Sequence, residues 1–481
     1  MGVPEPVPIS PEPLKRWREA LGERWGEVDE GARWAREALA GRAIWHLSST
    51  ARGGGVAEML RAVLPYARDA GIDTRWAVLR ERPEFFRVTK RLHNRLHGEA
   101  GDGGPLGEAE RRLYEATLAA SGERLEALWR AGDVVYLHDP QTAGLAPRAR
   151  RAGLTVIWRC HIGTERPNEL AREAWAFLLP YVEAADALVF SRAEFVWDGV
   201  AGKAHVMPPS IDPFTPKNQE LEPDAVAAIL RAIGLVDGGP RGAPGFVRAD
   251  RTPGRVERSA TLLQEGPLPV GAPVVAQVSR WDRLKGHRGV LEAFARLEAP
   301  DAHLVLAGPE PGGVADDPES EAVWEEVAAA WRALRPAARG RIHIAGLPME
   351  DLDENWAMVN AIQRRAAVVA QKSLAEGFGL TVAEAMWKRR PVVASRVGGI
   401  QDQVLDGETG VLLDDPRDLD AFAAAVRGLL ADPERARRMG EAGRRRVRER
   451  FLSVPRLLDY LGLIARLLGL SGPPPRGAAV R

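Results

Sequence analysis

Two glutamates, Glu376 and Glu384, stand on either side of a glycine-rich turn and the start of an expected helix. The turn is Gly377-Phe378-Gly379, and the helix is expected to begin near Leu380. Apolar runs at 366–370 and 391–394 flank this stretch, so it reads as strand, glycine turn, helix and strand. Such a turn presents free backbone N–H groups and the positive end of a helix dipole. We therefore expect an anion to bind here, most commonly a phosphate.

The spacing of the two glutamates bears on what they could do. Glu376 precedes the turn, and Glu384 lies one turn into the helix, so the carboxylates share a pocket without being side by side. This argues against a pair that shares one proton. It suits two separate hydrogen-bond acceptors for the two ends of an elongated polyhydroxy ligand. A capping glutamate and a solvated helix glutamate remain an alternative interpretation.

Two cations, Arg280 and Lys285, follow an apolar run at 273–278 in the sequence SRWDRLKG. Cations just beyond the end of a strand could clamp a diphosphate. Only seven of the 66 basic residues are lysines, so Lys285 carries more information than Arg280. Solvated loop charges are the alternative, especially for Arg280.

Gly53, Gly54 and Gly55 open a helix after the apolar run at 43–47. Glycine allows a ligand to approach the backbone closely. The stretch is neither a G-x-G-x-x-G pattern nor a P-loop with its lysine. A plain turn therefore remains the alternative to a ligand-binding loop.

A polar group is expected where two further strands end. His138, Asp139 and Gln141 follow the run at 133–137, and His161 follows the run at 155–158. A structural role for His161 is the alternative to a catalytic one. The spacings C-x-x-C, H-E-x-x-H and G-x-S-x-G are absent from the sequence, so no metal site or serine nucleophile is predicted.

Short apolar runs alternate with helical segments along the chain, which predicts parallel, doubly wound sheets. Residues 208–213 (PPSIDP) form a stiff extended linker between two such units. Residues 236–271 are rich in Gly, Pro and Arg and are expected to carry little regular structure. The last helix, 454–469, has one apolar face and is expected to pack rather than bind a membrane. The predicted strands are 43–47, 74–79, 133–137, 155–158, 187–190, 205–207, 273–278, 303–307, 341–345, 366–370 and 391–394.

The composition bounds the class of protein. A chain of 481 residues is too long for one core, and its formal net charge of zero argues against nucleic acid or an anionic membrane as partner. The single cysteine, Cys160, cannot form an intrachain disulfide, which fits a cytoplasmic location. Residues 1–13 do not resemble a signal peptide, and no apolar run is long enough to span a membrane.

The motifs together resemble a known family. EGFGLTVAE (376–384) looks like the E-x7-E element of family-4 retaining glycosyltransferases, and SRWDRLKG (279–286) resembles their donor-phosphate loop. PVVASRVGGI (391–400) and DGETGVLL (406–413) are similar to their usual continuation. WRCHIG (158–163) and MPPSIDP (207–213) resemble the trehalose glycosyltransferring synthases. Gly286 departs from the pattern, because many relatives have an acidic residue there.

This resemblance implies a GT-B fold, in which two Rossmann-like doubly wound domains face each other across a cleft. It implies an acceptor-side domain, 1–212, completed by 452–481 through a helix that crosses back, and a nucleotide-sugar-binding domain, 213–451. It also implies a retaining transfer of glucose from a nucleoside diphosphate, such as UDP-glucose or ADP-glucose, to free glucose, giving trehalose. The alternatives are a sugar phosphorylase, a family-4 transferase with another acceptor, and a regulatory protein with an inactive site.

The resemblance assigns roles to individual residues. Glu376 would contact the donor sugar, Glu384 the ribose, and Arg280 and Lys285 the diphosphate. His161 would lie beside the reacting sugar near its 6-hydroxyl. The remaining donor-binding residues would be Gly54, Gly55, Gly377, Phe378, Gly379 and Leu380, and the acceptor-binding residues His138, Asp139 and Gln141. No metal or other cofactor is expected, the partners are small molecules, and a homodimer is one option for the assembly.

Overall fold

The computed structural model describes residues 4–51, 55–239, 242–311 and 319–470. The chain divides into two compact units. The first unit comprises Met1–Ser210 with Leu452–Arg481, and the second unit comprises Ile211–Phe451. The chain passes between them within the proline-rich stretch 208–213 and again at Phe451.

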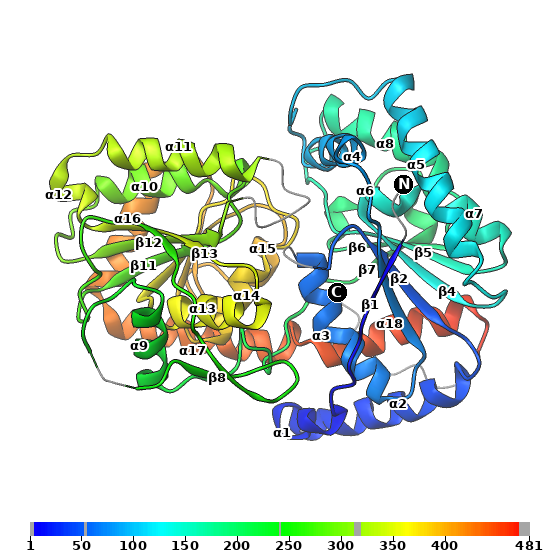
Figure 1. Cartoon of the computed structure of the whole chain (residues 1–481), viewed down its shortest axis with the longest axis horizontal. Coiled ribbons are helices and arrows are strands. Elements are labelled where there is room, and N and C mark those ends of the chain that lie inside the picture. Colours follow the sequence, from blue (N-terminus) through cyan, green and yellow to red (C-terminus); the bar gives the residue numbers. More distant parts are fainter. Residues whose placement is uncertain (1–3, 52–54, 240–241, 312–318, 471–481) are drawn as a thin grey trace. The chain divides into compact units, whose positions relative to one another are not determined.

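A seven-stranded sheet forms the centre of the first unit, in the order β1-β3-β2-β4-β5-β6-β7. All its pairs are parallel except β1 with β3. Helices α4, α5, α7 and α8 pack together over one face, while α2, α3 and α18 pack together over the other (Figure 1). The strands are β1 (Glu5–Val7), β2 (Ile44–Ser48), β3 (Thr74–Val78), β4 (Val134–His138), β5 (Thr155–Cys160), β6 (Ala187–Phe190) and β7 (Ala204–Val206). The helices are α1 (Trp17–Leu21), α2 (Trp25–Ala38), α3 (Gly55–Asp69), α4 (Pro83–Leu96), α5 (Glu108–Glu126), α6 (Asp139–Ala143), α7 (Ala146–Arg151), α8 (Glu169–Val182) and α18 (Ser453–Leu467).

The second unit repeats this plan with the order β10-β13-β12-β11-β14-β15-β16. Again one edge strand, β10, is antiparallel to its neighbour and the other pairs are parallel. Helices α10, α11 and α16 cover one face of the sheet, and α9, α13, α14 and α17 cover the other (Figure 1). The strands are β8 (Gly245–Val247), β9 (Pro253–Arg255), β10 (Thr261–Leu263), β11 (Val274–Val278), β12 (His303–Pro309), β13 (Ile342–Leu347), β14 (Val368–Gln371), β15 (Val392–Ser395) and β16 (Val411–Leu413). The helices are α9 (Pro223–Ala232), α10 (His287–Ala295), α11 (Ser320–Arg332), α12 (Pro336–Arg339), α13 (Leu352–Arg365), α14 (Leu380–Trp387), α15 (Ile400–Gln403), α16 (Leu419–Ala431) and α17 (Pro433–Arg450).

Burial on both faces explains why the central strands read as continuous apolar runs. Every residue of β4 and of β11 is buried, as expected for parallel strands covered by helices on both sides. Each fully buried Val, Leu or Ile side chain contributes about 1.5–3 kcal/mol relative to exposure. Side-chain caps define where several helices begin, and they come from Asn168 (α8), Asp351 (α13), Asp418 (α16) and Asp432 (α17).

The predicted doubly wound α/β fold and the predicted strands are confirmed, with ends that shift by up to two residues. The last helix packs on α2 and α3 of the first unit, so it crosses back as expected. The prediction of little structure in 236–271 is wrong, because β8 and β9 form a hairpin and β10 extends the second sheet. The apolar runs of these strands are too short to stand out among Gly, Pro and Arg.

Two further elements differ from the sequence prediction or were missed by it. The N-terminal helical segment is interrupted at Gly22, whose φ is 58°, so that α1 ends at Leu21 and α2 begins at Trp25. The proline-rich N-terminus supplies β1, and Pro6 is tolerated there because β1 is an edge strand. In the part of the chain that the structure describes, no helix is long and apolar enough to cross a membrane.

Candidate active site

The order of the strands reverses at one point in each sheet, between β2 and β4 in the first unit and between β11 and β14 in the second. Ligands of doubly wound sheets bind beyond the carboxyl ends of the strands at such a point. The loops after β11 and β14 carry Lys285 and Glu376, and the residues that follow β4 include Asp139. The candidate residues therefore lie where this fold places its ligands.

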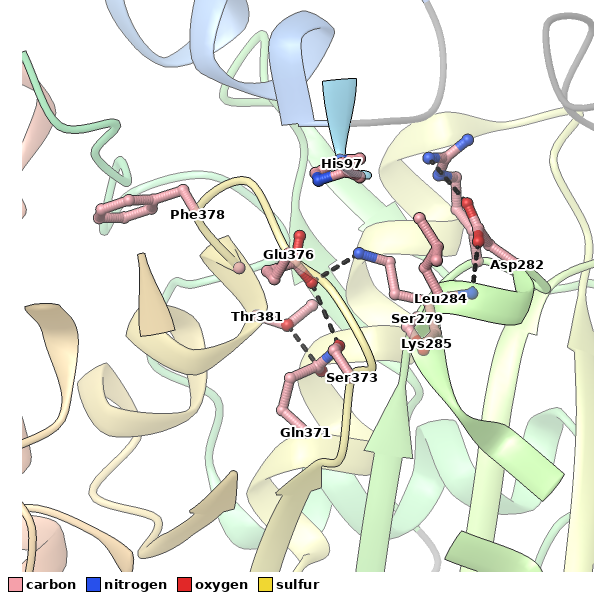
Figure 2. A network of polar contacts seen from close by, with 12 residues as sticks. His97, Ser279, Asp282, Leu284, Lys285, Gln371, Ser373, Glu376, Phe378 and Thr381 are labelled. Atoms are coloured by element: carbon pink, nitrogen blue, oxygen red, sulfur yellow. Dashed lines mark hydrogen bonds and ion pairs between the residues drawn. The ribbon is translucent and has the colours of Figure 1, made fainter. Parts of the chain in front are cut away.

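Lys285 and Glu376 form an ion pair in the second unit, with 2.6 Å between Nζ and Oε2 (Figure 2). Their side chains are only 16% and 10% exposed. The hydroxyl of Ser373 also donates to Oε2 of Glu376, at 3.3 Å. The structure thus brings together two of the predicted residues, one from each loop, in a largely dehydrated setting where charge interactions are strengthened.

A chain of hydrogen bonds supports this ion pair from below (Figure 2). Thr381, in the first turn of α14, donates to Oε1 of Gln371 at 2.9 Å. Gln371 Nε2 in turn donates to the hydroxyl of Ser373 at 2.9 Å. The orientation of the Glu376 carboxylate is therefore fixed through three side chains of the same strand–turn–helix element.

Gln277 ties the two loops to each other. Its side chain is fully buried, its Nε2 donates to the carbonyl of Lys285 at 2.9 Å, and its Oε1 accepts from the amide of Lys372 at 3.2 Å. The sequence interpretation did not include this residue. The available signal was an amide side chain inside the apolar run VVAQV, where an unpaired polar group would be costly.

Two glycines shape the turn that carries Glu376. Gly379 has a φ of 80° and immediately precedes α14, which begins at Leu380 as expected. Gly398 has a φ of 50°, and a side chain at this position would overlap the carbonyl oxygen of Glu376. The neighbouring amide of Gly399 donates to the carbonyl of Gly377 at 3.0 Å. Gly398 was quoted only as part of a motif, and the structure shows why no larger residue fits there.

Glu384 is buried in α14 rather than solvated, because only 2% of its side chain is exposed. Its Oε1 lies 2.9 Å from Nζ of Lys217, whereas Oε2 has no hydrogen-bond partner among the described residues. This excludes the alternative of a solvated helix glutamate. A buried carboxylate oxygen without a partner is available to accept a hydrogen bond from a ligand hydroxyl.

Lysines gather around Glu384 to a degree that the sequence analysis did not anticipate. Lys388 is buried and donates to Gln363 Oε1 at 2.7 Å and to Asn218 Oδ1 at 2.9 Å. Burial lowers the pKa of Lys388 well below its ordinary value. The scarcity of lysine in this sequence was the signal for Lys217 and Lys388, although it was applied only to Lys285.

Arg280 takes a different neighbour from Lys285. Its side chain is 25% exposed, and a guanidinium nitrogen lies 3.8 Å from Oδ2 of Asp282. Asp282 in turn caps the short 3-10 helix Arg283–Lys285 by accepting from the amide of Leu284 at 2.8 Å. Lys285 and Arg280 therefore each stand beside a carboxylate, and their joint role as a diphosphate clamp remains a prediction.

The glycine-rich loop after β2 is described only in part. Gly54, like Gly53, lies outside the described residues. Gly55 is exposed and is the first residue of α3, which agrees with the expected helix. A role for either glycine in donor binding stays a prediction.

In the first unit, His138, Asp139 and His161 come together at the ends of β4 and β5. Asp139 accepts from the amide of His161 at 2.7 Å, and His138 Nδ1 lies 3.1 Å from His161 Nε2. Asp139 has a φ of 62°, a left-handed conformation that non-glycine residues adopt at a cost and that clusters at functional sites. Gln141 lies on the same short helix, α6, and its Oε1 is buried with no partner among the described residues.

The electrostatics of this cluster keep its histidines neutral. Burial lowers the pKa of His138 and of His161 well below the ordinary value, and the nearby charge of Arg159 lowers both further. Arg159 is itself fully buried, and its Nε donates to His161 Nδ1 at 3.4 Å. His46, on β2, lies on the other side of His138. Sequence analysis gave no role to Arg159, which follows the predicted strand 155–158, or to His46, which lies inside the apolar run at 43–47.

No group of three or more His, Cys, Asp or Glu side chains among the described residues is arranged to hold a metal ion. Charge at this site is instead supplied by side chains and backbone amides. That the reaction needs no metal or other cofactor is a prediction that this observation leaves open.

Two family models match the chain. Residues 46–197 match "Trehalose synthase, N-terminal domain", and residues 259–446 match "Glycosyl transferases group 1". The first match contains the histidine cluster of the first unit, and the second contains both loops of the ion pair. The resemblance drawn from the motifs is thereby confirmed.

Individual relatives agree with these matches. The trehalose synthase of Rubrobacter xylanophilus is 37% identical over 93% of this chain and 95% of its own length. The trehalose phosphorylase of Pleurotus pulmonarius is 27% identical over 94% of this chain but only 60% of its own length. A solved structure of a UDP-forming α,α-trehalose-phosphate synthase from Burkholderia vietnamiensis superposes with a TM-score of 0.64. That similarity covers 92% of this chain and 98% of the other at 17% identity, and it shows the GT-B fold. On the strength of the long match at 37% identity, the chain belongs to the trehalose synthase family of glycosyltransferases.

Proposed function

We propose that the enzyme transfers glucose from a nucleoside-diphosphate-glucose to free glucose with retention of configuration, giving trehalose. Support for this reaction comes from the family and from the ion pair of Lys285 with Glu376 beyond β11 and β14. That ion pair is the observation that carries the proposal. It holds a cation and a hydroxyl acceptor side by side, where a diphosphate joined to a sugar needs them.

The second unit would bind the donor. Lys285 and Arg280 would take up the negative charge that grows on the diphosphate as the glycosidic bond breaks, and the amides of Gly379 and Leu380 at the start of α14 would assist. Glu376 would accept from hydroxyls of the glucose. Glu384 would accept from a ribose hydroxyl through Oε2, the oxygen that Lys217 does not occupy.

The backbone of the turn would complete the donor site. Gly377 and Phe378 lie between Glu376 and α14, and the carbonyl of Phe378 accepts from Gln403 Nε2 at 2.5 Å. The amides of the turn would donate to phosphate oxygens. Cations and amides together would neutralise the leaving group, so we propose that neither a metal nor another cofactor is required.

The first unit would bind the acceptor and contact the reacting sugar. His138, Asp139 and Gln141 surround the end of β4, and the free Oε1 of Gln141 is an acceptor for a glucose hydroxyl. His161 would lie beside the donor sugar near its 6-hydroxyl. Arg159 donates to Nδ1 over a long 3.4 Å, and we propose that this hydroxyl takes the place of Arg159 as the donor to the single lone pair of Nδ1.

The experiment is a donor screen. The enzyme is incubated with glucose and with UDP-, ADP- or GDP-glucose, and the products are separated and their linkage determined. A non-reducing disaccharide with an α,α-linkage is expected with at least one donor. Glu376→Gln serves as the control, and the absence of this product with every donor would reject the proposal.

The phosphorylase relative motivates a second candidate reaction, the phosphate-dependent breakdown of trehalose without a nucleotide. The test is incubation of trehalose with inorganic phosphate alone. Release of glucose and glucose phosphate under these conditions would favour this reaction over the transferase. Activity that depends on added nucleoside diphosphate would favour the transferase, running in reverse.

A further inference from the structure

Three histidines form a line across neighbouring strands of the first unit. His46 lies on β2, His138 ends β4, and His161 follows β5. His46 Nδ1 is 3.2 Å from His138 Nε2, and His138 Nδ1 is 3.1 Å from His161 Nε2. Successive rings are stacked, with centroids 5.5 and 5.4 Å apart and planes inclined by 22° and 20°.

Arg159 gives this line a direction. A guanidinium group can only donate, so His161 Nδ1, which lies 3.4 Å from Arg159 Nε, must carry a lone pair. The hydrogen of a neutral His161 is then on Nε2 and is donated to His138 Nδ1. By the same reasoning His138 donates from Nε2 to His46 Nδ1. One buried arginine thus sets the same tautomer, with hydrogen on Nε2, in all three rings.

The surroundings of the line favour the neutral form at every step. Burial lowers the pKa of His46 to about 3, with a further contribution from the charge of Arg159. Burial also lowers the pKa of His138, and its electrostatic interactions with His161, His46 and Arg159 lower this pKa further. Tyr136 stacks on His46 with ring centroids 4.9 Å apart, and Tyr460 of α18 lies under the Arg159 guanidinium at 5.3 Å. Of the acidic groups, Asp139 faces the cluster, and its Oδ1 accepts from the amide of His161.

The far end of the line argues against a path for protons. His46 and His138 border a small cavity of about 30 Å³ whose other walls are almost entirely apolar. Apart from the two histidines, only the hydroxyl groups of Thr74, Tyr136 and Tyr460 are available as polar side-chain groups in its lining. None of them is a strong base, so a proton that moved from His161 to His46 would find no carboxylate or further histidine in the lining to take it up. The line is therefore suited to hold His161 and not to relay its proton.

We propose that Arg159, His138 and His46 are positioning residues, which fix the ring plane of His161 and keep its Nδ1 as a hydrogen-bond acceptor. The functional part of this inference rests on the proposed function. A sugar hydroxyl that takes the place of Arg159 as donor then meets a lone pair of constant direction. A protonated ring could not accept from that hydroxyl, and it would oppose the positive charge that builds on the sugar during glycosyl transfer.

The variant His46→Leu tests the far end of the line without touching His161. It removes the nitrogen that accepts the hydrogen bond from His138 Nε2. The hydrogen of His138 can then move to Nδ1, and this breaks the hydrogen bond between His138 and His161. We expect kcat to fall about tenfold with KM for the donor within a factor of about two, because one buried hydrogen bond is lost. His46→Asn is the matched variant: its side-chain oxygen replaces Nδ1 as acceptor, and kcat should recover to within about threefold.

A second readout does not depend on activity. Histidines labelled with 15N report in long-range 1H–15N spectra which ring nitrogen carries hydrogen, and the protein has nine histidines. In the wild-type enzyme at neutral pH, His46, His138 and His161 should be neutral with hydrogen on Nε2, and His46→Leu should alter the signals of His138 and His161.

The outcomes separate this inference from the proposed reaction. A cationic His161, or hydrogen on its Nδ1 in the wild type, would overturn the positioning role whatever the enzyme makes. Unchanged kcat together with unchanged spectra in His46→Leu would overturn it as well. The predicted spectra in an enzyme that forms no trehalose would support the fixed tautomer and reject the proposed reaction.

Discussion

The two units surround the reversal points of their sheets with polar groups of different kinds. In the second unit these groups are ionic, with Lys285 paired to Glu376 and Lys217 to Glu384. In the first unit the corresponding groups are neutral rings in a hydrogen-bonded line that ends at Arg159.

This difference follows from what each unit is proposed to hold. A diphosphate brings two negative charges or more, and cations such as Lys285 compensate them through charge-assisted hydrogen bonds. Glucose is neutral, and neutral acceptors recognise its hydroxyls without a net charge to compensate. The same α/β architecture thus serves two ligands because the residues at the strand ends differ.

The largest effect is expected from the ionic side. Lys285→Ala should lower kcat/KM for the donor about 10³-fold, because it removes a cation from the leaving group and deprives Glu376 of its counter-ion. Initial rates of trehalose formation measure this. Lys15→Ala, at an exposed lysine, is the control and should have no effect. Retention of a tenth of the activity by Lys285→Ala would show that the ion pair is not central.

The geometry of the turn gives the next effect. Gly398→Ala should reduce kcat/KM about 100-fold, because the new side chain displaces the carbonyl of Glu376 and with it the carboxylate. Gly407→Ala is a matched control, since Gly407 also has a positive φ, 77°, but nothing lies within 4 Å of its added side chain. Equal losses in the two variants would mean that backbone strain alone, rather than the position of Glu376, is responsible.

A smaller pair of effects should separate donor binding from turnover. Glu384→Ala should raise KM for the donor about thirtyfold with little change in kcat, and Arg280→Ala should lower kcat about thirtyfold with little change in KM. Steady-state kinetics over a range of donor concentrations give both parameters. Glu384→Gln is the companion variant. Lys217 loses its charged partner in Glu384→Ala and in Glu384→Gln, but only Glu384→Gln keeps the buried shape of the side chain. If kcat and KM changed in parallel in both variants, the proposed division of roles between Glu384 and Arg280 would be wrong.

The neutral side of the comparison predicts the smallest effect, a pH dependence of stability. His46 has a pKa of about 3 in the folded protein, below the value of about 6.5 expected when unfolded. Between these values only the unfolded chain binds the proton, so stability is lost as pH falls below about 6.5. The loss is about 1.4 kcal/mol per pH unit for each such histidine, a factor of about ten.

In His46→Leu, the unfolded chain binds one proton fewer on acidification, so the free energy of unfolding should depend less steeply on pH. Urea unfolding at pH 7, 6 and 5 measures it, and the wild type should lose more stability on acidification than the variant. Identical slopes would mean that His46 is not buried in its neutral form.

Sequence patterns were sufficient for the parts of the molecule that depend on local order. Continuous apolar runs identified the parallel strands, because strands covered on both faces have no polar alternation. The start of α14 at Leu380 followed from the two glycines before it. Edge strands such as β1 and β10 were missed, because β1 contains a proline and β10 lies in a stretch rich in Gly, Pro and Arg, which hides runs of three residues.

The site was predicted as a set of residues rather than as contacts. Glu376 and Lys285 were both named, yet their ion pair was not, because a pattern shows which loops meet and not which side chains pair. Lys217 and Gln277 act through partners distant in sequence, and their roles become visible only in three dimensions. The left-handed backbone conformation of Asp139 could not be predicted either, because nothing in the sequence indicates a positive φ at a residue other than glycine.

The split of the first unit between the two ends of the chain has a consequence for how the protein is made. Tyr460 of α18 lies 5.6 Å from Tyr136 and also covers Arg159, so the core around the three histidines needs a helix that is synthesised after the whole second unit. On the ribosome, domains generally fold as their residues emerge, the N-terminal one first. Here the continuous second unit has all its residues before the first unit has its own. The order of completion is thus reversed, and the face of the N-terminal sheet that carries α2 and α3 is not fully covered until α18 has left the ribosome.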